Sequence, residues 1–146
     1  MSSPEGSTVI FRGMRARPGL RDFALALQSQ VARGRRFDCL ITTDAELRRL
    51  NRTFRGKNYA TDVLSFPAPT PEDGLGDLAI SYQRARAQAR EFRHSADTEI
   101  AILMLHGVLH LTGMDHETDG GRMARAEKRW RARLGLPNGL IERARV

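Results

Sequence analysis

The chain has little of several features that define large protein classes. Its 146 residues include a single cysteine, Cys39, so no disulfide can form within the chain, as is typical of proteins kept in a reducing cytoplasm. The most apolar stretch, 100–111, is far shorter than the roughly 20 residues of a membrane helix, and it contains two histidines. The first residues lack the apolar run of a signal peptide. The sequence therefore predicts a cytoplasmic protein that does not span a membrane.

Lysine is also scarce, although the chain is strongly basic. There are 22 arginines and 2 lysines against 17 acidic residues, and the formal net charge is +7. A basic surface attracts polyanions, and the planar guanidinium group suits bidentate contact with phosphate. Nucleic acid is thus a reasonable partner class. The alternative is a bias in genome composition that leaves most arginines on solvated helix faces.

The length and the hydrophobic pattern indicate one α+β domain over residues 1–146, with a flexible tail at 1–8. A chain of this size buries roughly 68 to 70% of its unfolded surface. About four strands and about five helices are expected, in mixed order along the chain, with the helices packed on a small sheet. The strands are expected at 8–12, 37–42, 63–66 and 77–82, and the helices at 20–32, 43–56, 83–92, 98–111 and 122–134.

Three of the four histidines fall within eleven residues, at the end of the expected buried helix. His106 and His110 are four residues apart, so both lie on one helix face. Gly113 can end the helix and let the chain fold His116 back toward them. Three imidazoles without a fourth protein ligand resemble a catalytic zinc site, which keeps one position open. The alternative is that these are ordinary core histidines.

Gly107 separates this motif from the metalloprotease pattern H-E-x-x-H-x-x-G-x-x-H. That pattern has the same spacing of histidines and glycine, but a glutamate follows its first histidine as the general base. Here Gly107 occupies the position, so the proteolytic base is absent. Because a glycine inside a helix costs about 1 kcal/mol relative to alanine, we expect another group to approach closely beside the metal.

A second group of candidate residues lies in a basic loop between a helix and a strand. Arg55 and Lys57 flank Gly56, so a phosphate could meet two cations and exposed backbone amides there. The alternative is an ordinary helix C-terminus, where cations are favoured by the helix dipole. If the site is catalytic, Asp115 and His94 are candidates for the residue that donates a proton to the leaving group. The sequence assigns that role to neither.

Three blocks in this order resemble the YbeY family of bacterial endoribonucleases, which act in ribosomal RNA maturation. They are L-N-R-T-F-R-G-K-x-x-x-T-D-V-L-S-F-P, G-D-L-A-I-S and H-G-V-L-H-L-T-G-M-D-H, within about 43–117. The resemblance implies a small mixed sheet, one zinc ion held by His106, His110 and His116, and Arg55 as the functional arginine of the cleft. It also implies the small ribosomal subunit and the Era GTPase as partners. The chain departs from the family pattern at Asn58, Ala60 and Met114.

The expected function is that of a zinc-dependent endoribonuclease of single-strand type, which hydrolyses RNA phosphodiester bonds in ribosomal RNA maturation and ribosome quality control. Three histidines would hold the zinc ion, which activates water near neutral pH, and Arg55 would stabilise charge on the phosphoryl oxygens. RNA rather than DNA is the expected partner. Two alternatives are a non-catalytic RNA-binding factor for ribosome assembly with structural zinc, and a metal-dependent protease, which Gly107 disfavours.

Overall fold

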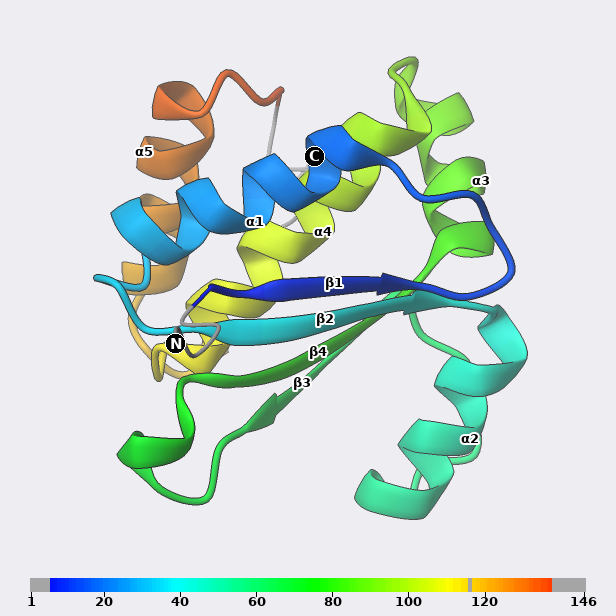
Figure 1. Ribbon diagram of the computed structural model, residues 1–146, viewed down its shortest axis with the longest axis horizontal. Coiled ribbons are helices and arrows are strands. Elements are labelled where there is room, and N and C mark those ends of the chain that lie inside the picture. The colour runs from blue at the N-terminus through cyan, green and yellow to red at the C-terminus, as the bar shows by residue number, and fades with distance from the viewer. Residues whose placement is uncertain (1–5, 116, 138–146) are drawn as a thin grey trace, which may run out of the picture.

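Four short strands form one mixed sheet in this computed structural model, which describes residues 6–115 and 117–137 (Figure 1). The strand order is β1-β2-β4-β3, with β3 antiparallel to β4 and the other neighbours parallel. Strand β3 ends in Pro67, which has no N–H to donate and is therefore suited to an edge strand. The strands are β1 (Thr8–Phe11), β2 (Phe37–Thr42), β3 (Val63–Pro67) and β4 (Gly76–Ser81).

Within the described residues, five α-helices pack on the two faces of the sheet, so the prediction of an α+β fold with about four strands and about five helices is confirmed. Helices α1, α3, α4 and α5 lie on one side of the sheet and α2 on the other (Figure 1). Among the described residues, no helix is long and apolar enough to cross a membrane. The helices are α1 (Pro18–Gln30), α2 (Asp44–Arg55), α3 (Tyr82–Phe92), α4 (Ala96–Leu111) and α5 (Arg122–Arg133), with a short 3-10 helix at Pro71–Asp73.

Helix α4 forms the centre of the core. Every residue from Glu99 to Leu109 is buried, and the helix packs against β3, β4, α1, α3 and α5. Its first turn is capped by Ser95, whose hydroxyl accepts a hydrogen bond from the Thr98 backbone N–H at 3.0 Å. A helix buried on all sides cannot rotate without disturbing several partners, so the direction of each of its side chains is fixed by packing.

Gly107 brings α4 against the sheet. A Cβ atom built on this residue would lie 2.6 Å from Cδ2 of Leu78, a buried residue of β4. The predicted close approach therefore exists, but its partner is a core side chain beneath the helix rather than a group beside a metal. The prediction was wrong on that point, because the spacing shows that a helix face is crowded without showing which element crowds it.

The first strand begins at Thr8, as expected, and the residue before it is hydrogen-bonded to neighbouring elements. Residues 1–5 lie outside the described residues, and Thr8 of β1 pairs with Asp38 of β2. The Ser7 hydroxyl donates to the Gln28 side chain at 2.8 Å and accepts from the Phe37 N–H at 2.9 Å. These bonds attach the start of β1 to α1 and β2.

Replacement of Gly107 by alanine is expected to destabilise the protein. Overpacking against Leu78 costs about 1–3 kcal/mol, and alanine returns about 1 kcal/mol of helix propensity. The net expectation is a loss of roughly 1 kcal/mol in the free energy of unfolding, measured by urea denaturation. Gly19→Ala in α1 is the control, because nothing lies within 4 Å of a Cβ atom there, and it should stabilise slightly. Equal stabilisation by both changes would contradict the packing argument.

Candidate functional site

A cleft of about 730 Å³ lies between the C-terminal ends of α2 and α4, with β3 along its side. It brings Arg55 together with His106 and His110, which lie about fifty residues further along the sequence. The residues that line it are Phe54, Arg55, Lys57, Thr61, Asp62, Val63, Ser65, Phe66, Pro67, His106, His110, Asp115 and Glu117.

The two histidines lie one helical turn apart, and each engages an oxygen through Nδ1. His106 is 5% exposed, and its Nδ1 lies 2.8 Å from Oε2 of Glu127 in α5. Nδ1 of His110 lies 3.0 Å from the Met114 carbonyl oxygen. A carbonyl only accepts, so His110 donates from Nδ1, and the basic nitrogen of its neutral ring is Nε2. A Glu127 carboxylate also only accepts, so His106 likewise donates from Nδ1 and has Nε2 as its basic nitrogen.

This arrangement fits a metal ion bound through Nε2. Metal-binding histidines usually donate their other ring N–H to a carboxylate or a carbonyl, which fixes the orientation of the ring. The ring centroids of His106 and His110 are 4.8 Å apart, with the planes at 76°. His116 lies outside the described residues, and within 6–115 and 117–137 no three His, Cys, Asp or Glu side chains group around a possible ion.

Glu127 is the residue that sequence reasoning missed. It lies in a strongly basic helix, yet it is only 1% exposed and contacts His106 across 21 residues of sequence. One signal was available: Glu127 follows Met123 by four residues and precedes Trp130 by three, so it shares their helix face. An acidic residue on the apolar face of a helix requires a buried partner.

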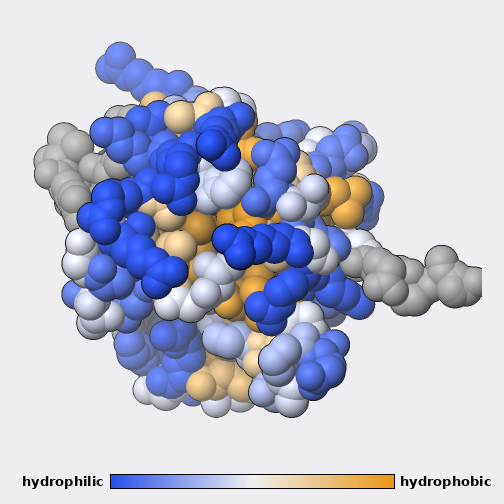
Figure 2. Space-filling view, turned by 90° about the vertical axis from the view of Figure 1, so that its left-hand side faces the viewer, coloured by the Kyte–Doolittle hydropathy of each residue, from blue (hydrophilic) through white to orange (hydrophobic). Residues whose placement is uncertain are grey.

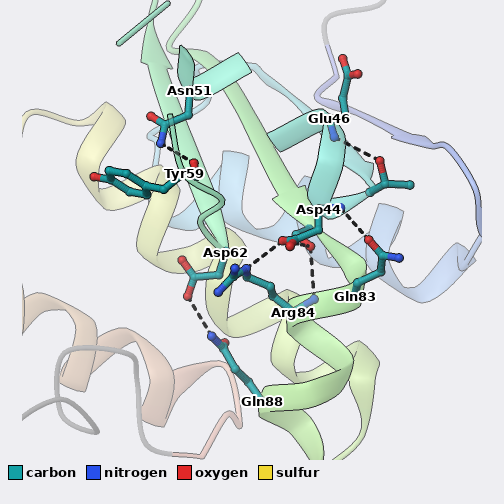
Figure 3. Close-up of polar contacts among 10 residues, drawn as sticks. Asp44, Glu46, Asn51, Tyr59, Asp62, Gln83, Arg84 and Gln88 are labelled. Carbon is teal, nitrogen blue, oxygen red and sulfur yellow. Dashed lines mark hydrogen bonds and ion pairs between the residues drawn. The ribbon is translucent and has the colours of Figure 1, made fainter. Parts of the chain in front are cut away.

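A buried asparagine of α2 holds the loop that carries Lys57. Helix α2 ends at Gly56, whose φ of 67° is the left-handed conformation usual for glycine at a helix end. Asn51 is 1% exposed, and its Nδ2 donates to the Tyr59 carbonyl at 2.9 Å (Figure 3). Nε2 of Gln88 in α3 donates to Asp62 at 3.2 Å. The loop is therefore hydrogen-bonded to α2 at its middle and to α3 near its end.

Two phenylalanines give the basic cleft an apolar wall. Phe54 and Phe66 meet edge to face, with ring centroids 5.8 Å apart and an interplanar angle of 70°. Phe54 is 66% exposed although it is large and apolar. An exposed aromatic ring next to Arg55 and Lys57 offers a stacking surface beside two cations.

The two proton-donor candidates are placed differently. Asp115 lines the cleft, and its Oδ1 accepts from the Glu117 N–H at 3.1 Å, so it also shapes the turn after α4. His94 lies near the opposite end of α4, where its Nε2 is 2.6 Å from Oε1 of the buried Glu99. The structure thus brings Asp115 to the cleft and keeps His94 away from it.

Gly107 also bears on the protease alternative. A side chain at this position would enter the core against Leu78 rather than the cleft, as the Cβ contact at 2.6 Å shows. In this fold, a glutamate after the first histidine could not reach the cleft without rearrangement of the core. The carbonyl oxygen of Gly107 faces β3 and accepts from the Ser65 hydroxyl at 3.3 Å.

The fold and the cleft define an α+β protein in which paired histidines and an arginine converge at the edge of a mixed sheet. The family described as Endoribonuclease YbeY matches residues 21–135. An Endoribonuclease YbeY from Solibacter usitatus is 69% identical, over 98% of both chains. One from Koribacter versatilis is 55% identical, over 71% of this chain and 68% of its own. The chain therefore belongs to the YbeY family.

A solved structure shares the fold of this chain. The solution structure of a Thermotoga maritima protein superposes with a TM-score of 0.61 at 28% sequence identity. The match covers 84% of this chain and 85% of the other. The shared fold thus extends over most of both chains.

Replacement of Asn51 by alanine is expected to loosen the basic loop. The Tyr59 carbonyl would lose its buried donor, so the free energy of unfolding should fall by about 1–3 kcal/mol. Amide exchange in 56–62 should accelerate more than in the sheet, as hydrogen exchange can measure. Asn58→Ala is the control, since its exposed contact with Arg48 should change stability by less than about 0.5 kcal/mol. Unchanged exchange in Asn51→Ala would show that the loop is held by other contacts.

Proposed function

We propose that this protein is a zinc-dependent endoribonuclease that hydrolyses phosphodiester bonds of unpaired RNA in ribosomal RNA maturation and ribosome quality control. Its relatives bear the name Endoribonuclease YbeY. The observation that carries the proposal is the convergence of Arg55 with His106 and His110 on one cleft. Cations that could bind a phosphate thus lie next to nitrogens that could bind a metal.

Different cleft residues would contact the phosphates and the bases of the RNA. The guanidinium of Arg55 can make two hydrogen bonds to phosphoryl oxygens, and charge builds up on these oxygens during hydrolysis. Lys57 adds a second positive charge at the same end of the cleft. Phe54 offers its exposed ring to a base, which must be unstacked to reach it. This combination favours single-stranded RNA over a duplex.

His106, His110 and His116 are the proposed ligands of one zinc ion. The Nδ1 contacts of the first two support this assignment, and the neighbours of the third, Asp115 and Glu117, both line the cleft. When bound, zinc supplies Lewis acidity and lowers the pKa of water to near neutrality. Glu127 and the Met114 carbonyl would keep the two rings in the tautomer that presents Nε2 to the ion.

The family resemblance extends the proposal to partners and location. We propose the small ribosomal subunit and the Era GTPase as partners, and the cytoplasm as the place of action. The positive net charge of +7 favours association with ribosomal RNA, since cationic side chains release counterions from phosphates when they bind.

Arg55→Ala should abolish most cleavage while leaving the fold intact. Loss of a donor to the developing charge typically costs about 100- to 1000-fold in rate, and we expect a drop in that range. The measurement is the cleavage rate of a labelled single-stranded RNA, with zinc content and circular dichroism as checks. Arg52→Ala is the matched control, because Arg52 is exposed on the same helix but does not line the cleft.

Two outcomes would contradict the proposal for the cleft. Cleavage by Arg55→Ala at the wild-type rate would remove the arginine from the mechanism. Wild-type protein that binds RNA and zinc but never cleaves would instead favour the non-catalytic assembly factor.

Glu127→Gln should weaken zinc binding by about tenfold or more, because the carboxylate that orients His106 would lose its charge. Competition with a chelator measures the affinity, and elemental analysis gives the zinc content. Glu99→Gln is a matched control, since it alters a buried His–Glu pair at the other end of α4. Wild-type protein without zinc affinity, or an equal loss in both variants, would contradict the proposed metal site.

A further inference from the structure

A second cavity, of about 370 Å³, lies where the C-terminal ends of α1 and α4 meet α5. Figure 2 looks onto this end of the molecule and shows hydrophilic side chains around a patch of hydrophobic surface. None of the described residues that line the cavity is acidic, and four are arginines: Arg33, Arg35, Arg122 and Arg129.

Three of these arginines have no partner for their guanidinium groups among the described residues. Arg35 donates from Nη2 to the Gly74 carbonyl at 3.1 Å. Arg33, Arg122 and Arg129 form no side-chain hydrogen bond or ion pair within 6–115 and 117–137. Four like charges around one small cavity repel each other, and a bound anion would offset that repulsion. A composition bias explains many arginines but not their convergence on a cavity whose described lining contains no acidic residue.

The apolar side chains of the cavity indicate a ligand that has an apolar part as well as an anionic group. Val31, Leu75 and Leu109 supply apolar surface, and the partly buried ring of Trp130 lies beside them. Gln30 and Thr112 add groups that can donate and accept hydrogen bonds. An apolar and aromatic floor within a cationic rim matches a nucleotide, whose base is flat and whose phosphate is anionic.

The second cavity is separated from the cleft by one short loop. Thr112 and Met114 line the cavity, and Asp115 lines the cleft. Three residues of chain span at most about 11 Å, so the two sites are neighbours around the end of α4. The same loop provides the Met114 carbonyl that accepts from His110. A single RNA strand that passes the end of α4 therefore meets both sites.

We propose that this cavity is an accessory site for one nucleotide of single-stranded RNA, outside the cleavage cleft. The inference rests on the proposed function, because it takes RNA as the substrate. The site binds a flanking phosphate through Arg33, Arg122 and Arg129 and accepts the attached base against the apolar floor. It lengthens the binding surface without contact to the reacting bond.

The chain contains a built-in reporter of this site, because Trp130 is its only tryptophan. Titration of the full-length protein with a twelve-nucleotide oligouridylate should change tryptophan fluorescence. Uridine monophosphate should give the same change at much higher concentration, and inorganic phosphate a smaller one. The response should fall with added salt, since counterions are displaced from each contacted phosphate.

Two double variants test the arginines. Arg122→Gln with Arg129→Gln should weaken oligouridylate binding about tenfold or more. It should also reduce the slope of log affinity against log salt by about 0.7 for each lost contact. Arg90→Gln with Lys128→Gln removes the same charge from exposed positions outside the cavity and should change affinity less than twofold. Arg33→Asn adds a variant whose fold is preserved, because φ at Arg33 is +54°, a conformation that asparagine tolerates.

Cleavage kinetics separate this site from the cleft. The Arg122/Arg129 variant should raise KM for a long RNA and leave kcat unchanged, whereas a dinucleotide substrate should be cleaved as by the wild type. Equal effects of both double variants, or no fluorescence change with RNA, would overturn the accessory site. Equal affinity for phosphate and oligouridylate would reduce it to an anion site and overturn the RNA assignment. Fluorescence binding without any cleavage would instead refute the proposed function and leave the accessory site standing.

Discussion

The contact between Gly107 and Leu78 determines where the site can form. With no side chain at 107, α4 packs close to β4, and the hydroxyl of Ser65 donates to the Gly107 carbonyl from β3. This close packing directs the preceding histidine into the cleft rather than into the core. A bulkier residue at 107 would lift the helix from the sheet and move both histidines relative to the loop of Arg55.

Helix α5 contacts a histidine of the cleft with one face, through Glu127, and contributes arginines of the other face to the second cavity. Its buried face places Glu127 at 2.8 Å from Nδ1 of His106, and each of these polar groups compensates the burial of the other. Its exposed face carries Arg122 and Arg129 to the rim of the second cavity. The position of this helix thus depends on a hydrogen bond to the candidate site, while its positive charge remains on the surface.

Local patterns explain the parts of the fold that the sequence predicted. A helix was expected from residue 43, and the Thr43 hydroxyl caps α2 by accepting from the Glu46 N–H at 3.2 Å, as in a capping box. The four-residue spacing placed His106 and His110 on one face of α4, as observed. The strand order, the antiparallel edge strand β3 and the Glu127 contact join distant segments, so no pattern within a short window contains them.

The position of Arg55 bears on two explanations that the sequence left open. A helix dipole favours cations in the last turn of α2, and both Arg52 and Arg55 are found there. Only Arg55 lines the cleft, and Lys57, which lies beyond the end of the helix at Gly56, lines it as well. The dipole therefore accounts for Arg52 and contributes at Arg55. It does not explain why a cation outside the helix faces the same cleft, whereas the proposed phosphate ligand would account for both.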